Sequence, residues 1–246
     1  MKQQATNGNS KDRRRLEELL DESFRLHRSE PRRAIELAQD AVELATRLHD
    51  TGCLAKAHYR IGCAKREISE YESALQHLDL SIEACTKAGD KRQLSAALHI
   101  KGSVLSLVGS LHVARNTLLE AAAIRRDLGL SIQTSDTLTD LGSTLFRLGD
   151  YAGALAALYE CLQLLEGEDE PLRLCIILSV IASVYVEANF DEKAAEYLQR
   201  GLALARAVGD RDQEALLRLQ SFALKSKQGS SDGSIKELEE IVALLG

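Results

Sequence analysis

The chain has 246 residues, of which 45% are apolar and only two are proline, so it has enough apolar residues for a core and few that would interrupt a helix. Its formal net charge is −6, with both signs interspersed along the chain. This pattern argues against nucleic acid as a partner, because phosphate binding needs clustered Lys and Arg.

The first ten residues are polar and lack apolar periodicity, so we expect a disordered lead over 1–10. They do not resemble a signal peptide. The longest apolar stretch, 175–186, is well short of the roughly 20 residues that span a bilayer. The five cysteines are an odd number and form no CxxC pair, which favours a reducing compartment and thiols packed in the core. We therefore expect a cytoplasmic protein with no membrane partner.

From Lys11 onward, apolar residues recur with the helical period of about 3.6 residues. A first pair of helices is expected before residue 50, with a break at Pro31. The first helices of the later pairs are predicted near 51–68, 91–108, 131–148, 170–188 and 211–228. The second helices are predicted near 71–88, 111–128, 151–166, 191–208 and 232–245. Gly and Asp at the breaks, such as Gly209 and Asp210, suit helix ends and helix caps.

Small residues recur at a fixed step of 40 residues, as at Gly62, Gly102 and Gly142. A small residue that recurs once per unit marks a place where two helices approach closely, so the chain is a repeat array. The step predicts a single domain over 11–246. Its units fall near 11–50, 51–90, 91–130, 131–169, 170–210 and 211–246.

One unit carries Leu141-Gly142, then Leu148-Gly149-Asp150-Tyr151, and then Ala154 and Leu158. This series resembles the tetratricopeptide repeat, in a long form of 40 residues instead of about 34. The resemblance implies an all-α fold, a right-handed α-α superhelix (a tetratricopeptide-like solenoid) of about six helix hairpins. It also implies a protein- or peptide-binding scaffold whose first helices line a concave groove.

The family's groove positions, carried over to this sequence, predict the residues that bind a partner. They are Lys56, Tyr59, Arg60, Cys63, His99, Ser103, Thr139, Ser143, Phe146, Ile176, Ser179, Ser183 and Val186. The amino-terminal half of this set is basic or bears His, and the carboxyl-terminal half is more apolar. The set suits an amphipathic helix or an extended segment with an acidic end. Alternatively, the serines are neutral surface residues and the aliphatic side chains pack on neighbouring units.

No nucleotide-binding loop and no HExxH motif is present in the sequence, so we expect no enzymatic activity, no cofactor and no metal site. The alternative function is a self-associating regulatory or sensor region of a larger bacterial signalling protein, with a cyclic-nucleotide-producing or transcriptional output domain. A homodimer would then form through the helix near 175–186 or through the last helix. The last helix ends in Leu244 and Leu245, so either more chain follows or this end packs against something. Alternatively, these two leucines only complete the last helix pair.

Overall fold

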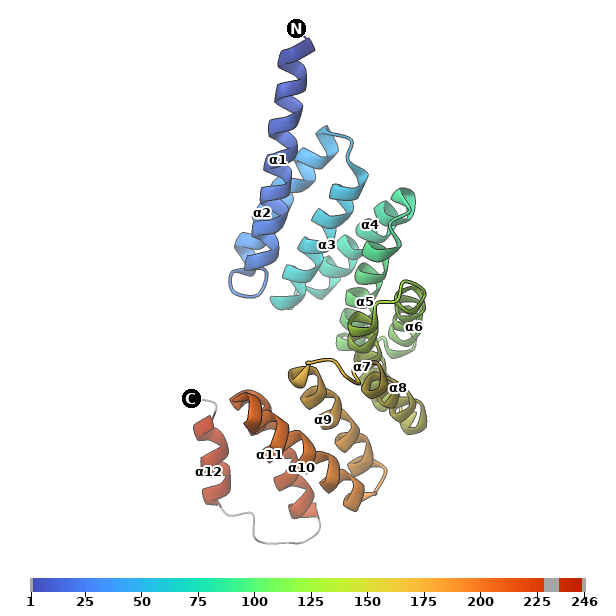
Figure 1. Cartoon of the computed structure of the whole chain (residues 1–246), viewed down its shortest axis with the longest axis vertical. Coiled ribbons are helices and arrows are strands. Elements are labelled where there is room, and N and C mark those ends of the chain that lie inside the picture. The colour runs from blue at the N-terminus through green and yellow to red at the C-terminus, as the bar shows by residue number, and fades with distance from the viewer. Residues whose placement is uncertain (1, 228–234, 245–246) are drawn as a thin grey trace. The chain divides into compact units, whose positions relative to one another are not determined.

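The computed structural model describes residues 2–227 and 235–244, with side chains for 10–227 and 238–244 (Figure 1). None of these residues forms a strand. The helices are α1 (Lys2–Leu26), α2 (Pro31–Arg47), α3 (Thr51–Glu67), α4 (Tyr71–Ala88), α5 (Lys91–Leu107), α6 (Leu111–Asp127), α7 (Ser131–Arg147), α8 (Tyr151–Leu164), α9 (Pro171–Glu187), α10 (Asp191–Val208), α11 (Arg211–Lys227) and α12 (Ile235–Leu244). They form consecutive hairpins, and we call the odd-numbered helix of each hairpin its A helix and the even-numbered one its B helix. The predicted all-α hairpin fold is confirmed.

Asp and Gly residues set many of the helix ends. The side chain of Asp90 accepts a hydrogen bond of 2.9 Å from the backbone N–H of Gln93, and Asp210 caps α11 through Gln213 at 3.0 Å. Gly209 ends α10 with φ of 72°, in the left-handed region that favours glycine. Helices α3 to α11 therefore begin and end within about two residues of their predicted positions. Residues 232–234 and 245 of the predicted last helix lie outside the described residues.

The amino-terminal helix is longer than predicted. Helix α1 begins at Lys2, whereas the disordered lead was expected to run to residue 10. No proline interrupts residues 2–10, and Gly8 is the only strongly unfavourable helix residue among them. A helix nucleated over the amphipathic stretch from Lys11 therefore extends backward, because each added residue gains one backbone hydrogen bond.

The recurring small residues lie inside the hairpins, where each A helix crosses its own B helix. A Cβ added to the glycine would lie 2.7 Å from Leu78 Cγ at Gly62, 2.6 Å from Leu118 Cγ at Gly102 and 2.8 Å from Leu158 Cγ at Gly142. Real Cβ atoms essentially never come so close to another heavy atom. Ala182 continues the series and is fully buried. The prediction that these residues admit a neighbouring helix is confirmed.

The chain divides into two compact units, Met1–Gly129 and Leu130–Gly246. In the first unit, α1, α2 and α3 share a core that includes Leu16, Leu19 and Leu37. In the second unit, Ile181 and Leu198 are among the largest fully or almost fully buried side chains. The single domain over 11–246 stays a prediction, and we describe each unit by itself.

Candidate protein-binding face

The structure divides the predicted site residues between the two units and exposes them to different degrees. Lys56 and Ile176 are exposed, whereas Cys63 and Ser179 are buried. The others are half-buried: Tyr59, Arg60, His99, Ser103, Thr139, Ser143, Phe146, Ser183 and Val186. All of them lie on A helices. A single groove that runs through both units stays a prediction.

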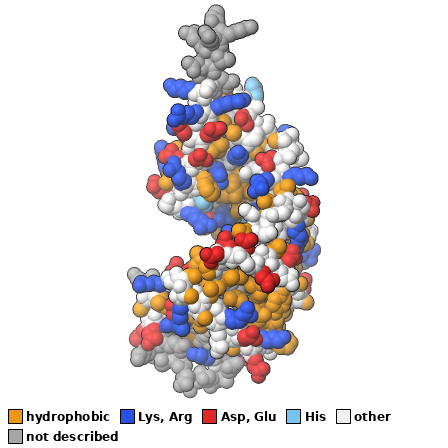
Figure 2. All heavy atoms as spheres, viewed as in Figure 1, with side chains coloured by type: hydrophobic (Ala, Val, Ile, Leu, Met, Phe, Trp, Pro, Cys, Tyr) orange, Lys and Arg blue, Asp and Glu red, His pale blue; other side chains and the backbone are white. Residues whose placement is uncertain are grey.

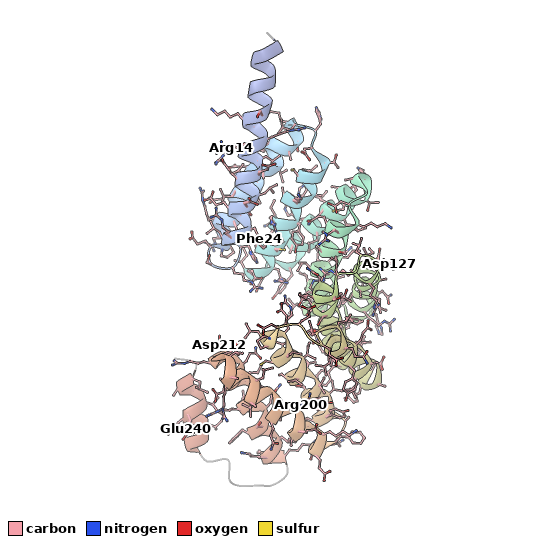
Figure 3. The ribbon with its side chains drawn as sticks, in the orientation of Figure 1. Arg14, Phe24, Asp127, Arg200, Asp212 and Glu240 are labelled. Atoms are coloured by element: carbon pink, nitrogen blue, oxygen red, sulfur yellow. The ribbon has the colours of Figure 1, made fainter. Side chains whose placement is uncertain are left out.

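In the first unit, an arginine is held between two aromatic rings. The guanidinium carbon of Arg60 lies 4.1 Å from the ring centroid of Phe24 and 5.4 Å from that of Tyr59. Phe24 is 51% exposed and is labelled on α1 in Figure 3. The buried Nε of Arg60 has no hydrogen-bond partner among the described residues, and burial lowers the pKa of this side chain. Lys56 lies one turn before Arg60 on α3, so this part of the face carries two cations, with Asp21 close to Arg60.

Two further residues predicted in the first unit are enclosed. Burial raises the pKa of Tyr59, so the phenol is neutral over the physiological range. His99 Nδ1 lies 3.2 Å from an Nη atom of Arg125, a B-helix residue that is only 6% exposed. Tyr59 and His99 therefore pack mainly against other residues of the unit and expose little surface to a partner.

In the second unit, α7, α9 and α11 are the A helices, and a glutamine joins two of them. Gln220 of α11 accepts a hydrogen bond of 3.0 Å from Ser179 through its Oε1 atom. Its Nε2 atom donates one of 3.0 Å to Ser183. Ser183 donates in turn to the backbone carbonyl of Ser179, at 3.1 Å. The predicted serines of α9 therefore hold α11 in place.

The hydroxyl groups on α7 are also satisfied within the protein. Thr139 donates to the carbonyl of Ser135 at 2.9 Å, and Ser143 donates to the carbonyl of Thr139 at 3.0 Å. These small side chains leave space above the helix without presenting a free donor. We call the exposed sides of α7, α9 and α11 the A-helix face of the second unit.

Four exposed aliphatic side chains lie on this face. Leu172 and Ile176 of α9 are 51% and 42% exposed, and Leu216 and Leu219 of α11 are 43% and 47% exposed. Their spacing of three or four residues puts each pair on one side of its helix. Figure 2 shows hydrophobic side chains gathered over α9 and α11. We call these four residues the apolar row.

A pocket of about 220 Å³ opens toward the carboxyl ends of the same helices. Its apolar walls come from Phe146, Ala182, Val186, Leu198 and Ala223, and its polar lining from Ser183, Gln220 and Glu187. Leu198 comes from the B helix α10 and faces the pocket beneath Ala182. The small residue at position 182 thus helps to leave this space open.

At the amino ends of α9 and α11, the face carries acidic residues. Arg173 donates to Asp136 at 2.7 Å and also pairs with Glu170, and the Asp136 contact is the main reason that the pKa of Arg173 is raised. Glu168 and Asp169 are exposed beside this pair. Asp212, exposed in the first turn of α11, is labelled in Figure 3.

Sequence reasoning missed several residues of this face. The groove positions were carried only as far as the fifth unit, and the same 40-residue step from Ile176, Val180 and Ser183 leads to Leu216, Gln220 and Ala223. Phe24 had no such signal, because α1 does not follow the repeat pattern of the later A helices.

The described residues contain no group of three or more His, Cys, Asp or Glu side chains that could hold a metal ion. Among the described helices, none is both long and apolar enough to cross a membrane. All five cysteines are free thiols, and four of them are buried.

A family model described as "Tetratricopeptide repeat" matches residues 93–167 and, overlapping with them, 133–207. One curated relative, the Tonsoku-like protein of Danio rerio, is 23% identical over 207 residues. That match covers 72% of this chain, but the chain spans only 14% of the length of the relative.

Solved structures with the same arrangement of helices include the apo form of RapI, with a TM-score of 0.81, 14% identity, and coverage of 94% of this chain and 82% of that one. A Rap protein complexed with competence and sporulation factor matches with a TM-score of 0.73 and 17% identity, over 90% of this chain and 60% of that one. Putative kinesin light chain repeats from Podosopora anserina match with a TM-score of 0.67 and 16% identity, over 79% and 96%. At these identities, the likeness shows the fold alone.

Proposed function

We propose that this chain, whose residues 93–207 match the tetratricopeptide repeat, is a non-enzymatic scaffold that binds a segment of another protein on its A helices. The apolar row on the second unit carries this proposal. Single exposed aliphatic residues are ordinary on a protein surface, whereas four together on one face mark an interaction site. One similar structure is that of a Rap protein complexed with competence and sporulation factor. Another is that of a Rap conjugation gene regulator in complex with the Phr* peptide.

The hydrogen bonds between α9 and α11 also support a binding role. Gln220 and the two serines fix the spacing of the helices that carry the apolar row. A face that is already ordered loses little conformational entropy when a ligand binds, so more of the contact energy contributes to affinity. In the first unit, Lys56 and Arg60 offer a separate cationic face for a segment with an acidic end.

A random 16-residue peptide phage library panned on the intact chain tests this proposal. Selected peptides are synthesised, and their affinity is measured by fluorescence polarisation. The double variant Ile176→Glu/Leu216→Glu should weaken binding at least tenfold, because a tenfold change is about 1.4 kcal/mol and burying one such side chain contributes about 1.5–3 kcal/mol.

Leu119→Glu is the matched control, since Leu119 lies on a B helix and is 45% exposed. It should leave the affinity unchanged. Failure to select any peptide, or equal loss of binding in the control and the double variant, would refute the proposal.

The alternative of self-association through residues 175–186 has less support in the structure. Ile177, Leu178, Ile181 and Val184 of this stretch are buried inside the second unit. They are therefore not available to a second copy while α9 stays folded. Light scattering at micromolar concentration separates the two functions, because a scaffold of this kind stays monomeric without its ligand.

A further inference from the structure

Resting on the proposed function, we infer that the segment bound by the second unit is basic at one end and apolar along the rest. The basic residues of the bound segment contact the amino ends of α9 and α11. Its aliphatic side chains cover the apolar row, and one large apolar side chain fills the pocket beside Phe146. The occupant is a short amphipathic segment of another protein.

The length of the face sets the length of the segment. The stripe on α9 runs from Leu172 to Val186, which is about 21 Å at 1.5 Å per residue. A helical ligand that lies along this stripe needs about four turns. Its apolar side chains must then recur every three or four residues to stay on the row.

The pocket accepts one side chain and not a small-molecule ligand. Its volume of about 220 Å³ is below the roughly 300–1,000 Å³ of pockets that hold small molecules. Of its polar lining, Ser183 and Gln220 already bond to each other and to Ser179, and Glu187 is exposed to solvent. Since these groups need little from a ligand, an apolar side chain can enter without leaving a buried donor or acceptor unpaired.

Charge selects the basic end of the segment. We call the carboxylates around the amino ends of α9 and α11 the acidic rim: Asp136, Glu168, Asp169, Glu170 and Asp212. The guanidinium groups among them are Arg173, which is shared between Asp136 and Glu170, and the exposed Arg211.

Acidic side chains border the hydrophobic region in Figure 2. Carboxylates at the amino ends of helices also interact favourably with the helix dipole. Five of them against two cations nevertheless leave a negative surface next to Leu172. A ligand end that carries Lys or Arg is attracted there, and an acidic end is repelled.

The second unit therefore favours a ligand of opposite charge to the one that the first unit favours. Lys56 and Arg60 of the first unit suit an acidic segment, as the sequence alone indicated. The acidic rim beside the apolar row is negative, so we do not expect the acidic end of a ligand to bind on the second unit.

The test uses the intact chain and the peptides selected from the random 16-residue library. The rim variant is Asp169→Lys/Asp212→Lys, and the pocket variant is Ala223→Trp, at an exposed position on the pocket wall. The control is Glu192→Lys/Glu196→Lys, which makes the same charge change on α10. Glu192 is in the first turn of α10, as Asp212 is in the first turn of α11. Circular dichroism checks that every variant is folded.

We expect the selected peptides that lose binding in Ile176→Glu/Leu216→Glu to combine Lys or Arg with aliphatic or aromatic residues. Their affinity should fall about tenfold in the rim variant and at least tenfold in the pocket variant, and stay unchanged in the control. Panning on the rim variant should recover peptides that are no longer basic.

The result also separates the two levels of the proposal. If selected peptides lose binding in Ile176→Glu/Leu216→Glu but are neither basic nor sensitive to the rim and pocket variants, the proposed function stands and this inference is wrong. If no peptide is selected, or binding does not depend on the apolar row, the proposed function fails first, and the inference fails with it.

Discussion

Replacing Gly142 with alanine tests whether the small-residue step sets the distance between the helices of a hairpin. The new Cβ would lie 2.8 Å from Leu158 Cγ, an atom in the branched part of the side chain that cannot move without the rest of it. Overpacking of this kind costs about 1–3 kcal/mol. Alanine in place of glycine in a helix gains back about 1 kcal/mol. We expect Gly142→Ala to reduce the free energy of unfolding by up to about 2 kcal/mol.

The sign of the effect should reverse when the facing leucine is removed. Leu158→Ala alone costs about 2–5 kcal/mol, because it leaves a cavity at a fully buried position. In that background the three heavy atoms nearest to the added Cβ of Gly142→Ala, all from Leu158, are gone, and the gain in helix propensity dominates. The second substitution should then stabilise the chain by up to about 1 kcal/mol.

Urea unfolding followed by circular dichroism measures these differences, with hydrogen exchange of the α7 and α8 amides as a local readout, since repeat arrays can unfold in parts. Gly52→Ala is the control: it is helical, and the nearest atom to its added Cβ is an Asp50 oxygen at an ordinary 3.6 Å. If Gly142→Ala stabilises the chain as Gly52→Ala does, or has the same effect in both backgrounds, the packing argument is refuted.

Three other expected outcomes follow from contacts in both units. Burial, with a smaller contribution from His58, lowers the pKa of His77 to about 4. Between about pH 6.5 and pH 4 the folded chain therefore binds fewer protons than the unfolded chain. The free energy of unfolding should thus fall as the pH drops through this range. After a discount for partial exposure, the loss between pH 7 and pH 5 should be about 1–2 kcal/mol in urea unfolding and should shrink in His77→Thr. Gln220→Ala leaves the two serines of α9 without their shared partner and should cost about 1–2 kcal/mol, read from faster hydrogen exchange in α11; no change there would contradict the bridging role. Asp210→Ala removes the cap of α11 and should cost about 1 kcal/mol in thermal unfolding, whereas Asp210→Asn should cost much less.

The sequence was sufficient for the hairpins because their determinants are local or strictly periodic. Gly142 and Leu158 recur at the same step as their counterparts in other units, and Asp210 stands directly before the helix that it caps. Such signals need no knowledge of distant contacts. The predicted bounds of the middle helices were therefore accurate.

The candidate face was harder to predict because its character depends on which side chains pair across helices. The serines of α9 were expected to leave room for a ligand, but Ser179 is buried against Gln220, 41 residues away in sequence. Arg60 was placed in the basic half of the groove, and its contact with the ring of Phe24 was not predicted. Neither pairing has a spacing rule, so neither could be found without coordinates.

The contact between Gly142 and Leu158 belongs to one hairpin and not to the border between hairpins. Each of the four central segments thus carries, as Gly62, Gly102, Gly142 or Ala182, the small residue that lets its own two helices pack closely. A gene that duplicates or deletes one such segment changes the number of modules without disturbing the fit inside any of them. Growth and shortening of the array by recombination should accordingly be tolerated more readily than insertion of a few residues within a module.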